Sequence, residues 1–123
     1  TFGFGFIREL ELLQEAGFTP LEVLRAATIQ GAELLDVAEE TGSIEVGKAA
    51  DLLVHDQNPL SDFKLLYATG AMRLNQESNK VEWPRALRHT IKGGIVYDVD
   101  ELLADVREMV AESRRASPEL PRP

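Results

Sequence analysis

The sequence predicts a small α+β unit in which helices come first, short strands follow, and another helix ends the fold. Three observations support this. Apolar residues keep helical spacing up to about residue 35, short strand patterns begin near Asp36, and helical spacing returns after Asp98. At 123 residues, the chain is long enough for one hydrophobic core and short for two.

The first predicted helix covers residues 7–16, because its apolar residues recur at helical spacing and Gly17 is placed to end it. A second helix begins directly afterwards. Thr19 is a good N-cap, Pro20 suits the first helical position, and Glu22 completes a capping box.

The second helix has two alternative buried sides in the sequence pattern. One consists of Leu21, Leu24 and Thr28, and the other of Val23, Ala26 and Ala27. Gly31 then loosens the helical spacing, and Ala32–Leu35 is expected to form a further short helical turn.

The strand region begins with a short candidate at residues 43–46. Ala50–Asp56 follows as a nearly continuous apolar strand, which predicts burial on both faces. Residues 63–84 hold at most one short strand, at Leu65–Ala68. The Gly93–Gly94 pair lies between two strand-like pieces and predicts a hairpin.

The last helix is predicted over residues 99–113, with Asp98 or Asp100 as its cap. The tail at residues 114–123 carries three prolines and is expected to be loose. The predicted helix has an apolar side made of Leu102, Leu103, Val106, Met109 and Val110.

Composition narrows the function classes. The net charge of -8, from 21 acidic and 13 basic residues, disfavours a nucleic-acid partner or an anionic membrane surface. The absence of cysteine excludes disulfides, thiolate metal sites and a cysteine nucleophile. No apolar run approaches a membrane span of about 20 residues and no signal-peptide pattern is visible, so we expect a soluble protein with the cytoplasm favoured.

Gly42, Gly47 and Lys48 match the G-x-x-x-x-G-K spacing of a phosphate-binding loop. The following residue is Ala49, which lacks the hydroxyl that would hold magnesium, and Glu45 inside the loop would repel phosphate. A strand is expected after the loop, whereas a phosphate loop needs a helix there. We therefore interpret the segment as a turn between strands. The partial G-x-G match in residues 3–8 is set aside because Arg8 replaces its third glycine.

The remaining polar candidates favour structural roles. His55 and His89 have no partner at metal-ligand spacing, so each is expected to be hydrogen-bonded or partly exposed. Asp51 and Asp56, which bracket a strand, are expected to bind turn backbone rather than to act as an acid–base pair. The serines at 43 and 61 have no nearby base to activate them as nucleophiles.

Three segments in order carry a family resemblance: TPLEVLRAAT at 19–28, GSIEVGKAADL with DQNPL at 42–60, and RHTIKGGIVYD at 88–98. Together they resemble the C-terminal end of metal-dependent amidohydrolases, in the imidazolonepropionase-like and prolidase-like branch. The resemblance covers about residues 5–98.

The resemblance implies an α/β fold, with a (β/α)8 barrel beside a small β-sandwich. Residues 1–36 would supply the last barrel helices. Residues 37–98 would supply C-terminal sandwich strands and a loop, followed by a C-terminal helix over 99–113 and the loose tail. A barrel needs about 250 residues, so we expect the chain to be a fragment whose partner is the remainder of the amidohydrolase.

The same resemblance implies a hydrolase acting on C–N bonds of an amide, a cyclic amide or a dipeptide, with zinc or another divalent metal in the complete enzyme. No family metal ligand or catalytic residue can be placed on this sequence, so this stretch alone is predicted to be inactive and to bind no metal. Thr1, Phe2 and Phe4 could approach the active-site mouth, because barrel chemistry lies in loops after strand ends.

Two further expectations concern assembly. Open edges of sandwich strands can pair with another copy, which predicts a homo-oligomer. The alternative function is a non-catalytic binding or oligomerisation module derived from the same family, for which an apolar patch and pairing-competent edges would serve.

Overall fold

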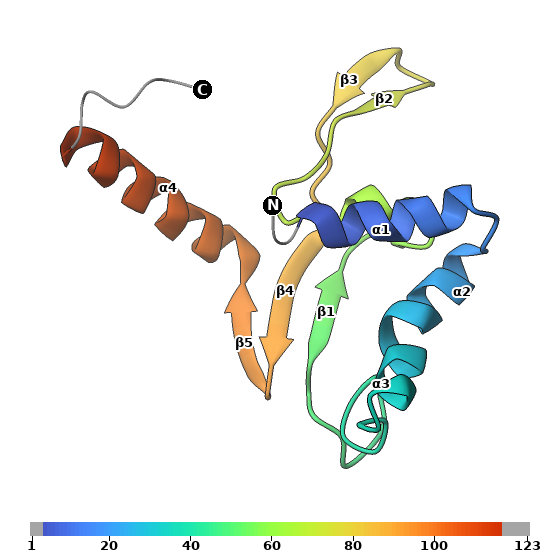
Figure 1. The fold of residues 1–123 in the computed structure, drawn as a ribbon. Helices are drawn as coiled ribbons and strands as arrows, with labels where there is room; N and C mark the ends of the chain where they lie inside the picture. Colours follow the sequence, from blue (N-terminus) through green and yellow to red (C-terminus); the bar gives the residue numbers. More distant parts are fainter. Residues whose placement is uncertain (1–3, 117–123) are drawn as a thin grey trace.

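The computed structural model describes residues 4–116, in which helices flank a three-stranded antiparallel sheet (Figure 1). The helices are α1 (Phe4–Glu15), α2 (Pro20–Arg25), a π-helical segment η1 (Ala26–Gln30), α3 (Gly31–Leu34), a 3₁₀ turn η2 (Phe63–Leu66) and α4 (Val99–Ala116). The strands are β1 (Leu52–His55), β2 (Arg73–Asn75), β3 (Lys80–Glu82), β4 (Leu87–Lys92) and β5 (Ile95–Asp98).

The predicted end of the first helix and start of the second are confirmed, whereas α1 begins at Phe4, three residues before the predicted start at residue 7. Gly17 adopts φ +103°, a left-handed conformation that suits glycine after a helix end. Thr19 Oγ1 accepts a hydrogen bond from Glu22 N, and the Glu22 side chain accepts one from Thr19 N at 2.8 Å. This reciprocal capping box satisfies backbone donors that the start of α2 would otherwise leave unpaired.

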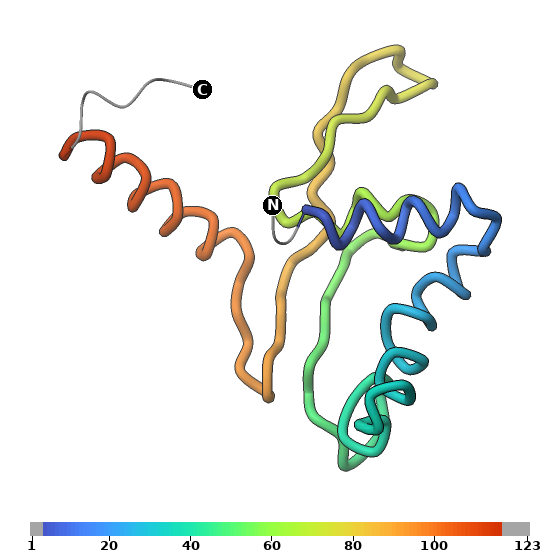
Figure 2. Tube along the Cα trace, in the orientation of Figure 1, coloured from blue at the N-terminus to red at the C-terminus, as the bar shows by residue number. Residues whose placement is uncertain are grey.

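The main core lies where α1, α2 and η2 meet. Ile7 and Leu10 of α1 are buried together with Val23 of α2 and Phe63 of η2. Of the two alternative sides of the second helix, the Val23 side faces this core, because Val23 is 0% exposed and Leu21 is 59% exposed. α2, η1 and α3 continue as one column of helix, which Figure 2 shows as an unbroken coil.

The sheet has the order β1-β4-β5, with every pair antiparallel. The predicted hairpin at Gly93–Gly94 is confirmed, since both glycines have positive φ and connect β4 to β5. β1 is shorter than the predicted strand and bulges between Val54 and His55.

The predicted burial of β1 on both faces is wrong for this chain. Leu53 and Val54 are neighbours that point to opposite faces, yet they are 56% and 41% exposed. Val96 and Tyr97 of β5 are also neighbours and are 59% and 40% exposed. Because adjacent residues on both strands are exposed, the described residues leave both faces of the sheet largely uncovered.

Two strand predictions fail. Residues 43–46 form an irregular loop, in which Ile44 is 87% exposed and no neighbouring strand within residues 4–116 pairs with it. Leu65–Ala68 is not a strand either. η2 occupies Phe63–Leu66, where Asp62 Oδ1 accepts a hydrogen bond from Lys64 N at 2.9 Å and starts a helical turn.

A second hairpin, β2–β3, lies within the region where the sequence predicted at most one strand. α4 extends to Ala116 instead of ending at residue 113, so the first residues of the predicted loose tail are helical. The rest of that tail lies outside the described residues. None of the helices described is long and apolar enough to cross a membrane.

Candidate functional site

The GSIEVGK segment is a loop that closes on itself. Lys48 Nζ lies 2.6 Å from Ser43 Oγ and 3.0 Å from Glu45 Oε1, so the lysine is neutralised inside the loop. Hydrogen bonds from Ser43 and then from Lys48 lower the pKa of Glu45. The chain enters β1 afterwards and not a helix. With Lys48 paired to Glu45 and a strand following, the segment does not fit a phosphate-binding loop. It is a turn that leads into β1, but the strand expected before it does not form in the described residues.

Gly5 of the partial G-x-G match lies within α1, so residues 4–8 form no phosphate-binding turn, and Gly3 lies outside the described residues. Ser43 donates its hydroxyl to Glu45 within the loop, and Ser61 Oγ donates to Asn58 O at 2.7 Å. Both serines therefore have structural partners.

Asp51 fastens the β4–β5 turn to the start of β1. Its Oδ1 accepts a hydrogen bond from Gly93 N at 2.7 Å, and its Oδ2 accepts one from Lys92 Nζ. The Lys92 ammonium, followed by the Gly93 amide, lowers the pKa of Asp51, because both favour the ionised carboxylate. The prediction that Asp51 binds turn backbone is confirmed.

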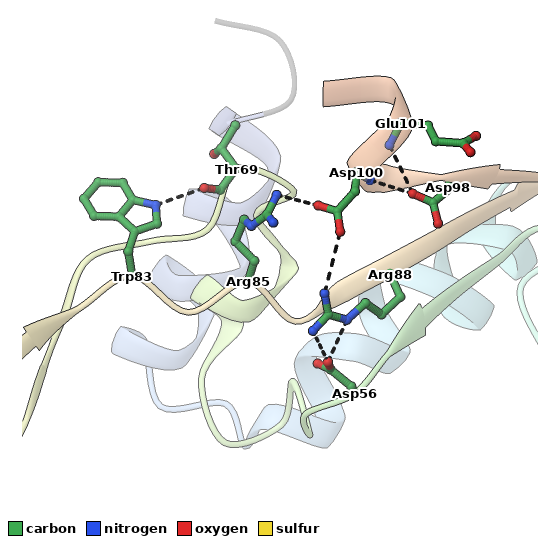
Figure 3. A network of polar contacts seen from close by, with 8 residues as sticks. All are labelled: Asp56, Thr69, Trp83, Arg85, Arg88, Asp98, Asp100 and Glu101. Carbon is green, nitrogen blue, oxygen red and sulfur yellow. Dashed lines mark hydrogen bonds and ion pairs between the residues drawn. The ribbon is translucent and has the colours of Figure 1, made fainter. Parts of the chain in front are cut away.

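Asp56 instead belongs to a network of side chains at the opposite end of the sheet (Figure 3). Arg88 donates Nε–H to Asp56 Oδ2 at 2.6 Å, and its Nη1 lies 3.9 Å from Asp100 Oδ2. Arg85 Nη1 lies 2.6 Å from Asp100 Oδ1. The expected backbone contact of the Asp56 carboxylate is therefore replaced by an arginine contact.

This network joins β1, β4 and the first turn of α4. Asp98 accepts hydrogen bonds from Asp100 N and Glu101 N at 2.9 and 3.1 Å and is the N-cap of α4. Hydrogen bonding to Asp56, together with the nearby carboxylates, raises the pKa of Arg88. These contacts hold the first turn of α4 at the end of the sheet. The carboxylates and guanidinium groups are paired with one another, so the network offers no free acid or base for catalysis.

The two histidines lie in different environments. His89 is cross-strand from Asp98, with Nε2 3.5 Å from Asp98 Oδ2. His55 lies at the bulge of β1, where both ring nitrogens are buried and have no hydrogen-bond partner among residues 4–116. Burial lowers the pKa of His55, against a smaller opposing effect of Asp56. Of the two expected alternatives, His55 meets partial exposure as a whole residue, whereas its ring nitrogens make no hydrogen bond within residues 4–116.

The described residues do not form a metal site. No group of three or more histidine, aspartate or glutamate side chains within residues 4–116 is arranged to hold a metal ion. The carboxylates of Asp51 and Asp56 are bound to lysine and arginine. These donor sets do not fit a divalent metal, because a cation already occupies each carboxylate.

Of the candidate active-site mouth, Thr1 and Phe2 lie outside the described residues. Phe4 begins α1 and stacks on Tyr67 with ring centroids 5.5 Å apart and planes at 29°. The roles of three residues could not be expected from the sequence, because their contacts are long-range and leave no local pattern: Tyr67, Arg85 and Arg88. The best available signal for Arg88 was its place at the start of a predicted strand.

Comparisons with known proteins find a family and several relatives that share part of this sequence. The sequence profile of the Amidohydrolase family matches residues 4–96. An imidazolonepropionase of Brevibacillus brevis is 47% identical over 60 residues, covering 48% of this chain and 13% of the relative.

Two other relatives have similar coverage. An imidazolonepropionase of Shouchella clausii is 31% identical over 80 residues, covering 65% of this chain and 16% of the relative. A 5'-deoxyadenosine deaminase of Methanobrevibacter smithii is 46% identical over 52 residues, covering 42% and 12%.

The matched part of the chain thus corresponds to less than a fifth of the length of each of these relatives. No solved structure matches. The family profile spans most of the chain, including the helix column, β1, β4 and the turn into β5. The chain belongs to the amidohydrolase family.

Proposed function

We propose that this chain is the C-terminal segment of a metal-dependent amidohydrolase that hydrolyses a C–N bond in an amide, a cyclic amide or a dipeptide. Membership of the family supports the reaction class. The relatives named imidazolonepropionase and deaminase support it too, and each is several times longer than the stretch that matches.

The observation that carries the proposal is the amount of uncovered surface. The chain exposes 9545 Å², whereas a compact monomer of 13.6 kDa exposes about 6,600 Å². The excess includes apolar side chains on both faces of the β1-β4-β5 sheet. Such a sheet needs further layers, and the remainder of an amidohydrolase would supply them.

In the proposed parent, α1, α2 and α3 close the barrel, and β1, β4 and β5 complete the accessory sandwich. The Asp51–Gly93 and Asp56–Arg88 contacts hold these strands in register. Thr1, Phe2 and Phe4 would stand near the active-site mouth, with Phe4 held by Tyr67.

A zinc or other divalent ion in the parent would lower the pKa of a bound water and polarise the scissile carbonyl. Its ligands would lie in the remainder of the protein, because the described residues here offer no fitting donor set. The segment alone is therefore expected to be inactive.

The test begins with the nucleotide sequence upstream of the Thr1 codon. We expect an open frame that continues for about 250 residues or more and encodes an H-x-H pair. The full-length protein should then bind divalent metal, measured by elemental analysis. It should also hydrolyse at least one member of a panel of cyclic amides, acyl amides and dipeptides, and lose this activity with chelator.

A stop codon immediately upstream would overturn the proposal. The chain would then be a natural short product, and a non-catalytic binding or oligomerisation module of amidohydrolase ancestry would be the better function.

A further inference from the structure

The β2–β3 hairpin is a separate sheet of two strands, and it projects from the rest of the described chain (Figures 1 and 2). Within residues 4–116, each of its strands therefore pairs on one side only. The open edge of a strand presents backbone donors and acceptors that another strand can pair with.

One face of the hairpin is apolar. Leu74 of β2 and Val81 of β3 are directly opposite each other in the register, and both side chains are more than half exposed. Met72 and Trp83, the residues next to the two strands, are exposed to a similar extent. Residues 4–116 thus leave this face uncovered.

The other face of the hairpin is polar and carries charges of both signs. Asn75 Nδ2 donates to Glu82 Oε1 at 2.6 Å, and Arg73 Nη2 lies 3.8 Å from Glu82 Oε2. Lys80 lies on the same face, two residues before Glu82. The open edge of β3 therefore presents the order basic, apolar, acidic.

This order is complementary to itself when two copies of β3 run antiparallel about Val81. Val81 then faces the partner's Val81, while Lys80 faces Glu82 of the partner subunit and Glu82 faces Lys80 of the partner subunit. On the polar face, each Glu82 would lie between its own Arg73 and the partner's Lys80. On the apolar face, the Leu74 and Val81 side chains of both copies would form one continuous row.

Other arrangements of the same edges fit less well. An antiparallel pair centred on Lys80 or on Glu82 brings two like charges directly opposite each other, which is unfavourable. A shift by one residue places the apolar face of one hairpin on the polar face of the other. Pairing through β2, centred on Leu74, places Arg73 opposite Asn75 and forms no ion pair. The charges therefore favour one edge and one register.

We propose that β3 pairs with β3 of a second copy of this chain, antiparallel and centred on Val81, so that two hairpins become one four-stranded sheet. A second copy is the occupant that the charges favour, because the same strand supplies the lysine and the glutamate on both sides of the two-fold axis. An isolated two-stranded hairpin is marginally stable in water, and two further strands stabilise it. The proposal rests on the hairpin alone and does not depend on the enzymatic function.

Charge reversal in the full-length protein tests the pairing. Lys80→Glu should weaken self-association about 10-fold in analytical ultracentrifugation, because glutamates then face each other on both sides of the axis. Glu82→Lys should weaken it for the equivalent reason, and an equimolar mixture of the two variants should regain association. Lys64→Glu makes the same charge change on η2, outside the hairpin, and is the matched control that should associate like the wild type.

Site-directed cross-linking tests the register without changing any charge. Val81→Cys should form a disulfide between copies under mild oxidation, because Val81 faces its own copy across the axis. Leu74→Cys is the matched control on the same face of the hairpin. It should stay unlinked, because three strand spacings, about 14 Å, would separate Leu74 from the partner's Leu74. Mass spectrometry identifies the linked peptides and separates them from thiols elsewhere in a longer protein.

Three results would overturn the proposal. The first is unchanged self-association of both charge variants, or a mixture of them that stays dissociated. The second is a disulfide through Leu74→Cys and none through Val81→Cys, which would mean that copies join through β2. The third is a monomeric full-length protein in which the β3 amides are protected from hydrogen exchange, which would mean that another part of the same molecule covers this edge.

Discussion

His55 occupies an uncommon position for a histidine, since both ring nitrogens are buried and neither has a hydrogen-bond partner within residues 4–116. A buried imidazole without partners is easier to keep neutral than charged. The sequence placed His55 near the end of a strand correctly. It gave no sign of the bulge at this position, because a bulge depends on pairing with β4.

The stability of the full-length protein should depend on pH through His55. Burial lowers the pKa of His55 below its usual 6.5, so the folded state takes up a proton less readily than the unfolded state. Above about pH 6.5, His55 is neutral in both the folded and the unfolded state and does not change the free energy of unfolding. The free energy of unfolding falls as the pH drops below that value, because the unfolded state then binds the proton more readily. Urea unfolding between pH 5 and 8 should show the fall.

The His55→Leu variant should lose this part of the pH dependence and keep its stability near neutral pH, because an unpaired buried polar group is removed. His89→Gln is the control and should retain the fall, since His55 is intact. If the wild-type and His55→Leu curves are parallel below pH 6.5, His55 gains a partner in the longer protein.

Gly70 shows another feature that depends on contacts distant in sequence. Its φ is +75°, and an added Cβ would lie 2.7 Å from Trp83 Cδ1 and from Pro84 O. Trp83 Nε1 also donates to Thr69 O at 2.9 Å, so the base of the β2–β3 hairpin closes tightly on this residue. The sequence gives no local sign of this requirement, since the approaching residues are more than ten positions away.

At the scale of elements, local capping signals predicted the structure well. The Thr19–Glu22 box, Gly17 and the Gly93–Gly94 turn each act through neighbours in sequence, and each is present. The β2–β3 hairpin was missed because its strands are three residues each and its turn lacks an Asn-Gly pair. Its signals were Asn75, whose Oδ1 accepts from Glu77 N and Ser78 N, and Asn79 at φ +51°.

The start of α4 depends on Arg88, and Arg88→Met should loosen it. Loss of the guanidinium leaves Asp56 without its arginine contact and removes one of two arginines near Asp100. Hydrogen exchange of the full-length protein should become faster in residues 99–104. Global stability should change little, since these ion pairs are exposed.

Arg73→Met is a matched control, because Arg73 also forms an exposed ion pair, with Glu82 at 3.8 Å on the remote hairpin. It should leave exchange at α4 unchanged. Equal exchange at residues 99–104 in wild type and Arg88→Met would mean that the Asp98 cap and Arg85 suffice to hold the helix.

At the scale of the whole molecule, the sequence predicted the family and the coarse order of helices, strands and a last helix. It assigned no catalytic site, for a physical reason. No set of described side chains gathers at one point as a metal centre, so neither residues nor structure could assign a catalytic role. The wrong prediction for β1 has the same origin. Its apolar sequence indicates two covered faces, whereas residues 4–116 leave both faces largely uncovered; in the proposed parent the remainder of the protein would cover them.

If this chain is part of a longer protein, both faces of the sheet should respond to mutation as buried surfaces and not as open ones. Leu53 and Val96 are over half exposed here and point to opposite faces. In the full-length protein, both would be buried by neighbouring layers. Leu53→Asp and Val96→Asp should then each destabilise it by about 3–5 kcal/mol, because each leaves an unpaired carboxylate in an apolar contact.

Chemical unfolding of the full-length protein measures these changes, with Leu53→Met as a volume-matched control expected to lose less than about 1.5 kcal/mol. Destabilisation by only one of the two aspartates would mean that one face remains open, which would leave that face available to a partner. If both aspartates are tolerated, neither face is covered, and the sheet would not be part of a sandwich.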